Sequence, residues 1–159
     1  MYVDTGIGLA HTRLSIIDIS DRSNQPFWDE SGRYCIIFNG EIYNFQEIRT
    51  KLEAMGVEFR TSGDTEVLLK AIVHFGEKII NDLMGMFSFC FYDKQSNVSI
   101  LCQDRFGIKP LYYALQSNRL VFSSEQAPIL KSVGSSPDVS SIFSYLLGSG
   151  ESSTVRALF

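Results

Sequence analysis

The stretch "IIFNGEIYNF", residues 36–45, joins an apolar run directly to an amide, a residue without a side chain and a carboxylate. Tyr34 to Phe38 form a continuous apolar run, which is typical of a strand covered on both faces. We expect this strand to stop at Asn39-Gly40. Asn-Gly between β-rich segments is a strong hairpin signal, so one interpretation is a tight turn. The other is functional: the Asn39 amide and the Gly40 N–H point at one oxygen and stabilise an oxyanion.

Two amphipathic helices are predicted after this stretch. In the first, Asn44 is the expected N-cap, with Glu47 as its reciprocal partner. The second has apolar residues along one side, Asp64 or Thr65 as its cap, and Gly76 as its stop. A short third helix is expected in "EKIINDL".

Beyond residue 85 the pattern changes to short β-rich runs separated by turn-forming residues, namely "MFSFCFYD", "VSILCQD", "LYYAL" and "RLVFSSE". These runs predict antiparallel hairpins, and "EQAPILKSV" predicts a helix that follows them. In "DRFGIKPLYY" we expect a structural corner across which Asp104 and Arg105 pair. The layout indicates an α+β domain over residues 1–133, with residues 134–159 as a linker and the start of another domain.

Composition narrows the classes of partner. The formal net charge of −4 argues against a nucleic acid or an anionic membrane surface, because both need clustered Lys and Arg. No run of about 18 apolar residues predicts a membrane span. The cysteines Cys35, Cys90 and Cys102 are odd in number and lack CxxC spacing, so we expect a cytoplasmic protein. With only two histidines, they predict no metal site.

Several charged residues point to a small ligand. Arg13 lies beside an apolar run, where an unpaired guanidinium is costly, and its planar fork suits a carboxylate of the protein or of a ligand. Taken alone, Glu41 and Asp64 are more simply solvated carboxylates, or a helix cap for Asp64. Together, a cation, two anions and the Asn39-Gly40 pair suit a zwitterionic substrate with a carbonyl, such as an amino acid amide.

Six ordered stretches carry a resemblance to a known family: "GLAHTRLSIID", "FNGEIYNFQEIR", "FRTSGDTEVLLKA", "GMFSFCFYD", "DRFGIKPLYY" and "VFSSE". Over roughly Gly6 to Lys131 the chain resembles the N-terminal glutaminase domain of glutamine-hydrolysing asparagine synthetases. The resemblance implies the class II, N-terminal-nucleophile amidotransferase fold, an αββα sandwich of two antiparallel sheets. It also implies that residues 1–133 are a partial glutamine amidotransferase domain, and that residues 134–159 begin a synthetase domain.

The resemblance assigns roles by motif position. Asn39 and Gly40 resemble the oxyanion pair, Arg13 resembles the residue that holds the α-carboxylate of L-glutamine, and Glu41 and Asp64 resemble the groups around its α-ammonium. In the family an N-terminal cysteine attacks the glutamine amide, and the ammonia passes to an adenylated aspartate in the synthetase domain. This domain then needs no cofactor, while ATP and Mg²⁺ are expected in the synthetase domain.

One departure from the family concerns the nucleophile. Family members begin with Met-Cys several dozen residues upstream of the segment matching "GLAHTRL", whereas this chain begins with Met1-Tyr2. We expect an N-terminally truncated fragment that is inactive alone, because the cysteines in strands carry no free α-amino group. An unpaired sheet edge left by the missing strand could promote a homodimer. The alternative is a degenerate, non-catalytic glutamine-binding or interaction module.

Overall fold

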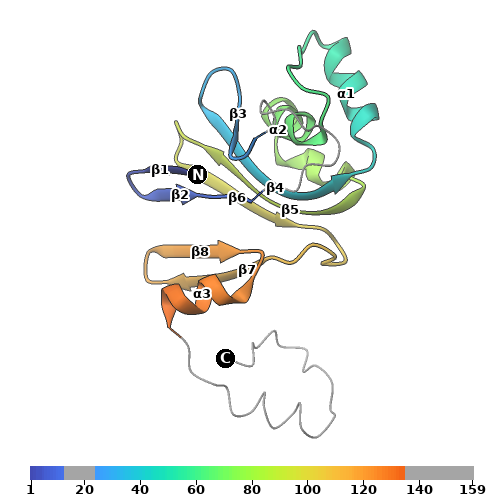
Figure 1. The fold of residues 1–159 in the computed structure, drawn as a ribbon. Helices are drawn as coiled ribbons and strands as arrows, with labels where there is room; N and C mark the ends of the chain where they lie inside the picture. Colours follow the sequence, from blue (N-terminus) through green and yellow to red (C-terminus); the bar gives the residue numbers. More distant parts are fainter. Residues whose placement is uncertain (13–23, 135–159) are drawn as a thin grey trace, which may run out of the picture. The chain divides into compact units, whose positions relative to one another are not determined.

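The computed structural model describes residues 1–12 and 24–134. The chain divides into two compact units, Met1–Pro110 and Leu111–Phe159. Arg13 and almost all of the predicted linker and synthetase segment, residues 135–159, lie outside the described residues. The elements are labelled in Figure 1.

The first unit contains a hairpin and a four-stranded antiparallel sheet. The hairpin pairs β1 (Tyr2–Asp4) with β2 (Ile7–Leu9). The sheet has the order β3-β4-β5-β6, made of β3 (Phe27–Trp28), β4 (Tyr34–Ile42), β5 (Gly85–Asp93) and β6 (Val98–Gln103). Between β4 and β5 the chain forms α1 (Phe45–Ala54), α2 (Asp64–Phe75) and the short 3₁₀ helix η2 (Glu77–Asp82). These are the helices that the sequence predicted.

The expected end of the first long strand was wrong. β4 does not stop at Asn39-Gly40 but continues to Ile42, so the interpretation of Asn-Gly as a tight turn is also wrong. The reason is the length of β5, which pairs with β4 from Tyr34 opposite Asp93 to Ile42 opposite Gly85. Backbone pairing along nine positions outweighs the local turn preference of the dipeptide.

The caps of both helices also differ from the prediction. Asn44 occupies the N-cap position of α1, but its side chain makes no cap hydrogen bond. Its amide instead donates to the Asp82 carbonyl at 2.9 Å and accepts the Met84 N–H at 3.0 Å. The N-cap of α2 is Gly63, and Asp64 is the first helical residue. Tertiary contacts have taken the Asn44 side chain away from capping, whereas Asp64 bonds the Ile42 N–H from the first position of α2.

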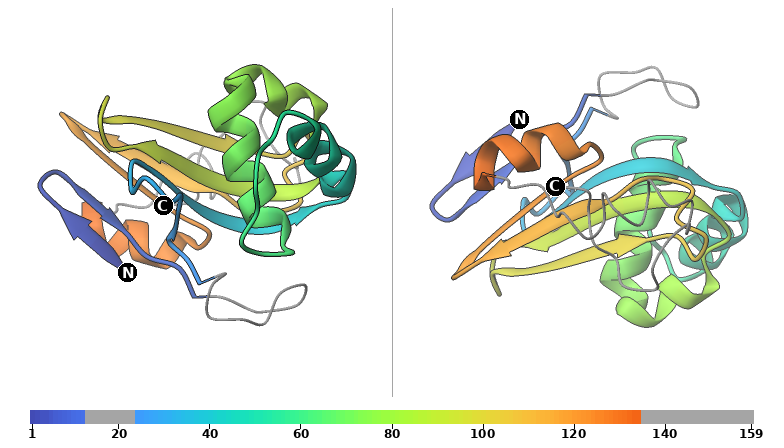
Figure 2. Two further views of the ribbon diagram at one scale, coloured as in Figure 1. Left: turned by 90° about the horizontal axis from the view of Figure 1, so that it is seen from above. Right: turned by 90° about the horizontal axis from the view of Figure 1, so that it is seen from below.

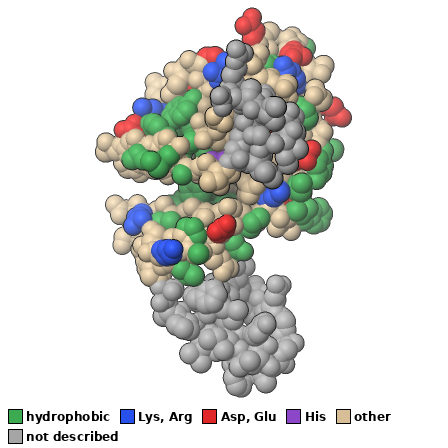
Figure 3. Space-filling model, in the orientation of Figure 1, with side chains coloured by type: hydrophobic (Ala, Val, Ile, Leu, Met, Phe, Trp, Pro, Cys, Tyr) green, Lys and Arg blue, Asp and Glu red, His purple; other side chains and the backbone are tan. Residues whose placement is uncertain are grey.

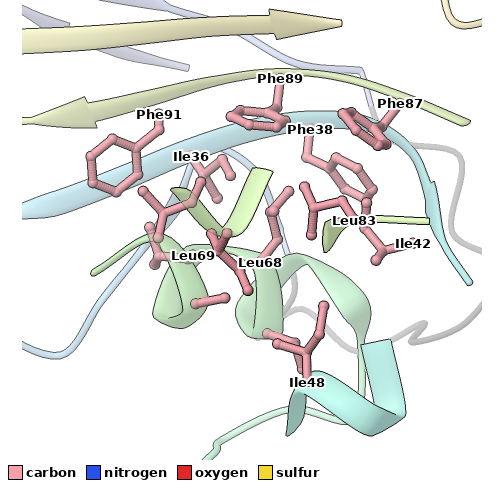
Figure 4. Close-up of a cluster of buried hydrophobic side chains, with 14 of the residues drawn as sticks. Ile36, Phe38, Ile42, Ile48, Leu68, Leu69, Leu83, Phe87, Phe89 and Phe91 are labelled. Carbon is pink, nitrogen blue, oxygen red and sulfur yellow. The ribbon is translucent and has the colours of Figure 1, made fainter. Parts of the chain in front are cut away.

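The main core lies between α1, α2 and one face of the sheet. Figure 2 shows the two helices side by side on that face. Alternation along the strands sends every second side chain of β4 and β5 into the core. Figure 4 shows the aromatic rings of Phe87, Phe89 and Phe91 above Leu68 and Leu69 of α2.

The second unit contains a smaller antiparallel hairpin and one helix. β7 (Tyr112–Gln116) pairs with β8 (Arg119–Ser123), and α3 (Gln126–Val133) packs on both strands. These elements match the predicted hairpin and helix. In the parts of the chain that the structure describes, no helix has the length and apolar character needed to cross a membrane. On the face drawn in Figure 3, the Lys and Arg side chains lie among Asp and Glu side chains.

Candidate functional site

The predicted oxyanion pair lies near the C-terminal end of β4. Asn39 and Glu41 belong to the row of side chains that alternates with the core row of Ile36, Phe38 and Ile42. Both therefore project from the face of the sheet opposite α1 and α2, and both are half-buried. Among residues 1–12 and 24–134, no group forms a hydrogen bond with the Asn39 amide. The side chain is thus available to a ligand.

The Gly40 N–H faces the edge of β4 that lies away from β5, where none of residues 1–12 and 24–134 forms a hydrogen bond with it. Residues of an antiparallel strand alternate in which side their N–H and C=O groups face. The Phe38 N–H donates to Gln25 Oε1 at 2.6 Å, and the Ile42 N–H donates to Asp64 Oδ2 at 3.1 Å, both on the side away from β5. Gly40 has the same parity as these two residues. Its N–H therefore faces the same edge, at a point that β3 does not reach.

Only glycine fits at position 40. Its φ is +151°, and a Cβ there would lie 2.1 Å from the Met86 carbonyl oxygen and 2.6 Å from the Phe87 Cα. Both are backbone atoms of β5, which cannot move away without breaking the ladder. The absence of a side chain at Gly40 thus lets β5 lie close to β4, and it would equally let a ligand approach the backbone.

Asp64 contacts the edge of β4 at Ile42, two residues beyond Gly40, although Ile42 and Asp64 are 22 residues apart in the chain. Its side chain is buried at the start of α2, and its bond to the Ile42 N–H fixes it against the end of β4. Burial raises the pKa of the Asp64 carboxyl, and the negative charge of Glu41 raises it further. Hydrogen bonds from the backbone N–H groups of Ile42, Asp64 and Thr65 oppose this rise.

Glu41 and Asp64 thus form an acidic pair that lacks a cation among the described residues. None of the ion pairs within residues 1–12 and 24–134 involves either carboxylate. A buried carboxylate close to a second one is stabilised when a cation binds between or beside them. The pair is therefore suited to an ammonium group, next to an amide and a backbone N–H suited to a carbonyl oxygen.

A buried ionic cluster shapes the loop that leads into Asp64. Glu66 is fully buried and accepts hydrogen bonds from the Arg60 and Thr61 N–H groups, at 3.0 and 2.7 Å, and from the Thr61 hydroxyl at 2.7 Å. Lys70 lies 3.1 Å from the same carboxylate, one helical turn later. Burial alone would raise the pKa of Glu66, but these bonds together lower it. Glu66 is thus ionised and holds the backbone of Arg60 and Thr61, just before Asp64.

The expected pairing of Asp104 with Arg105 is wrong. The Asp104 carboxylate accepts four backbone N–H groups, at distances of 3.0 to 3.2 Å, from Phe87, Phe106, Ile108 and Lys109. Burial would raise its pKa, but these hydrogen bonds lower it. Arg105 donates to the Asn81 carbonyl instead. Asp104 therefore ties the corner loop to Phe87, the residue of β5 that lies opposite Gly40.

None of the three cysteines is suited to act as the nucleophile. All are free, and they lie within β4, β5 and β6 as predicted. Burial raises the pKa of Cys35 and of Cys90 to about 12, and it also raises the pKa of Cys102. A thiol with so high a pKa is almost entirely protonated at neutral pH and therefore unreactive.

The structure brings together four of the five predicted site residues. Asn39, Gly40 and Glu41 are consecutive on β4, and Asp64 contacts the end of the same strand. Arg13 lies outside the described residues. Sequence reasoning missed Gln25 and Glu66: nothing in "NQPFW" marks the first, whereas the second could have been found from its i,i+4 spacing to Lys70 within an apolar helix.

Comparison with known proteins identifies the family of the chain. A family model described as "Glutamine amidotransferase domain" matches residues 1–157. The chain is 44% identical over 127 residues to asparagine synthetase [glutamine-hydrolyzing] 1 of Bacillus subtilis, which covers 80% of this chain and 20% of that protein. It is 39% identical over 136 residues to asparagine synthetase 2 of the same organism, covering 86% and 17%. The chain thus spans about a fifth of the length of these relatives.

A solved structure shows the same fold. Glutamine phosphoribosylpyrophosphate amidotransferase from B. subtilis matches with a TM-score of 0.63 at 24% identity, over 78% of this chain and 28% of that one. This likeness confirms the predicted fold class, that of the N-terminal-nucleophile amidotransferases. Together with the family match, it shows that the chain belongs to the glutamine amidotransferase domain family.

Proposed function

We propose that this chain provides the glutamine-binding site of an asparagine-synthetase-like amidotransferase. Asn39 and Gly40 donate hydrogen bonds to the side-chain carbonyl of L-glutamine. Glu41 and Asp64 hold its α-ammonium, and Arg13 holds its α-carboxylate. The observation that carries this proposal is the acidic pair, which has no cation partner within residues 1–12 and 24–134 and lies at the end of the strand whose Gly40 N–H has no partner there either.

The proposed chemistry belongs to the complete protein. A cysteine thiolate attacks the side-chain amide carbon, and the negative charge that forms on the oxygen is stabilised by Asn39 and Gly40. The leaving nitrogen then takes up a proton, the C–N bond breaks and ammonia departs. Water hydrolyses the remaining thioester, which gives glutamate and the free thiol. Cys35 and Cys90 are excluded by their burial and raised pKa, so we assign the attack to the N-terminal cysteine that the family resemblance implies.

We further propose that the ammonia is used by a synthetase domain of the same parent chain. That domain would amidate aspartate or a related carboxylate with ATP and Mg²⁺, and residues 134–159 would lead into it from a glutaminase domain of residues 1–133. The free state of all three cysteines supports a cytoplasmic location. A homodimer stays a prediction.

Calorimetry with a set of related ligands tests the binding site. L-glutamine should bind to the chain more tightly than glutaramate, which lacks the α-ammonium, and more tightly than L-norleucine, which lacks the side-chain carbonyl. Loss of the α-ammonium should weaken binding by roughly tenfold or more, and loss of the side-chain carbonyl should weaken it by roughly threefold, because the donors at the carbonyl act mainly on the transition state. Equal affinity for all three ligands, or no binding of L-glutamine, would overturn the proposal. Binding with no ammonia release by the complete protein would favour the non-catalytic module instead.

Arg13→Lys tests the part of the site that lies outside the described residues. An ammonium cannot form the bidentate contact that a guanidinium makes with a carboxylate, so the affinity for L-glutamine should fall. The affinity for L-glutamine amide, which has no α-carboxylate, should change much less. An equal loss for both ligands would remove the proposed role of Arg13.

A further inference from the structure

Gln25 makes an unusual pair of contacts with the backbone of β4. Its side-chain Oε1 accepts the Phe38 N–H at 2.6 Å, and its Nε2 donates to the Phe38 carbonyl at 2.9 Å. One side-chain amide thus satisfies both backbone groups of one strand residue. A neighbouring strand normally supplies these two bonds through its own backbone.

The position of this contact explains its use. β3 pairs Phe27 with Ile36 and Trp28 with Cys35. After Ile36, the next residue of β4 whose N–H and C=O face this edge is Phe38. The chain preceding β3 reaches this site with the Gln25 side chain rather than with its backbone. Gln25 therefore extends the contact with this edge of β4 past Phe27, the first residue of β3. The residue that it bonds, Phe38, directly precedes Asn39.

The N–H groups of Phe38, Gly40 and Ile42 face the same edge of β4. Gln25 occupies the first of the three and Asp64 occupies the last. The Gly40 N–H lies between two neighbours whose directions are fixed by buried or half-buried side chains. Hydrogen-bond donors in an oxyanion site must be held in advance, since a displacement of about 1 Å can lower a rate by roughly a hundredfold.

We propose that Gln25 is a positioning residue for the carbonyl-binding donors of β4. It acts through the Phe38 backbone and fixes the direction of the Gly40 N–H and the setting of Asn39, without touching the substrate. This inference rests on the proposed function, because it assumes that these donors receive the glutamine carbonyl. It adds a residue that neither the strand pattern nor the charged ligand groups of the site would indicate.

Gln25→Glu is the sharpest variant for a test. The side chain keeps its shape and can still accept the Phe38 N–H, but an ionised carboxylate cannot donate to the Phe38 carbonyl and repels it. The matched control is Gln103→Glu. Gln103 is the exposed last residue of β6, and its amide donates to the Lys109 carbonyl at 2.9 Å. This contact does not involve β4.

NMR spectroscopy of the chain gives a readout that a purely structural role would not change. In the wild type, L-glutamine should shift the Gly40 amide proton, and L-norleucine should not. In Gln25→Glu this shift should be largely lost, while the affinity for L-glutamine falls by no more than about threefold, because the contacts to the α-groups remain. The control variant should behave as the wild type.

Two failures can be told apart. A wild-type Gly40 amide that does not respond to L-glutamine would overturn the proposed function. A wild-type response that Gln25→Glu preserves in full would overturn the inference while leaving the function intact. Hydrogen exchange gives a second measurement without ligand: Gln25→Glu should speed exchange at the Phe38 amide, which bonds Gln25, by about tenfold and leave α2 unchanged. Equal acceleration in α2 would assign Gln25 to general stability and reject the positioning role.

In the complete protein, the kinetic constants should separate in the same way. Gln25→Glu should lower kcat for glutamine hydrolysis by roughly tenfold to a hundredfold, with KM nearly unchanged. Combined with Asn39→Ala, the loss should be smaller than the product of the two single effects, because both changes act on one group of donors. A raised KM with an unchanged kcat would contradict the inference.

Discussion

The two ends of the β4–β5 ladder differ in whether their carboxylates are paired with a cation. At one end, Arg33 forms a bidentate pair with Asp93, with Nε–Oδ1 and Nη2–Oδ2 distances of 2.9 and 2.7 Å. This pair lowers the pKa of the Asp93 carboxyl well below its usual range. At the other end, burial raises the pKa of Asp64, and the charge of Glu41 raises it further. The charges at the Asp93 end are paired within the chain and serve the fold, whereas those of Glu41 and Asp64 have no cation partner in the part of the chain that the structure describes.

The backbone differs in the same sense. At the Asp93 end the strands carry large side chains, and the Arg33 guanidinium lies 4.7 Å from the centre of the Tyr34 ring. At the other end, Gly40 and Gly85 let the two backbones approach so closely that a Cβ at either position would lie 2.1 Å from a carbonyl oxygen. The site end is therefore the one with least tolerance for substitution. Four substitutions test this difference between the two ends.

Gly40→Ala should have the largest effect. The added methyl group would meet two backbone atoms of β5, and the positive φ adds strain, so we expect a loss of about 3 kcal/mol or more in the free energy of unfolding. Urea denaturation measures this loss. Gly32→Ala is the control, because Gly32 also has a positive φ, +68°, but has open space around it. Its cost should be about 1–2 kcal/mol; equal losses for the two variants would show that the close approach is unimportant.

Asn39→Ala should lower the rate of glutamine hydrolysis by the complete protein by about a hundredfold to a thousandfold. Thermal stability should be almost unchanged, because the Asn39 amide has no partner among the described residues. Amidation driven by added ammonia bypasses the site and should be retained. Asn81→Ala, at an exposed position, is the matched control. A normal rate with glutamine would remove the proposed role of Asn39.

Asp64→Asn should separate binding from stability. Loss of a charge that faces the α-ammonium should weaken L-glutamine binding by roughly tenfold to a hundredfold. Because the folded-state pKa is raised, the ionised carboxylate destabilises the fold above the ordinary pKa of about 4. The variant should therefore be more stable than the wild type at pH 7, and this advantage should disappear near pH 3. Lower stability at pH 7 would contradict the raised pKa.

Arg33→Gln should have the smallest effect and should act only on the fold. The pKa of Asp93 is depressed in the folded state, so its pairing with Arg33 contributes stability above the ordinary pKa of about 4 and loses this contribution as the pH falls further. The wild type should exceed the variant in unfolding free energy at pH 7, and the difference should shrink in more acidic solution. The affinity for L-glutamine should stay the same; a change would show that the two ends are coupled.

Local patterns were sufficient for most of the secondary structure. The period of the apolar residues placed both helices and the β-rich runs, because side chains that face one core must recur with the period of their element. The errors lie where distant residues act on a short segment. Asn39-Gly40 remains in a strand because β5 pairs with it, and Asn44 turns away from its helix to bond the Asp82 and Met84 backbone.

The candidate site was partly predictable for a similar reason. Asn39, Gly40 and Glu41 are neighbours in sequence and were singled out by the motif resemblance, because their chemistry alone left a turn and a solvated carboxylate open. The roles of Gln25 and Asp104 could not be predicted, because each depends on backbone groups that lie far away in the chain. When a polar side chain bonds to a backbone group, its partner can be a residue of any type, so the sequence holds no sign of the contact.

By itself, the sequence determined the order of helices and strands, the family and the residue types that a zwitterionic amide would need. The order of the elements and the residue types follow from periodicity and from the chemistry of side chains, which are local properties, whereas the family follows from the resemblance of six ordered stretches of the sequence. Only the tertiary structure placed Asp64 against the end of β4, aimed the Gly40 N–H at the edge of β4 that lies away from β5 and engaged the Phe38 backbone with Gln25. The reason is that strand pairing and helix packing determine which N–H groups are occupied and which remain for a ligand.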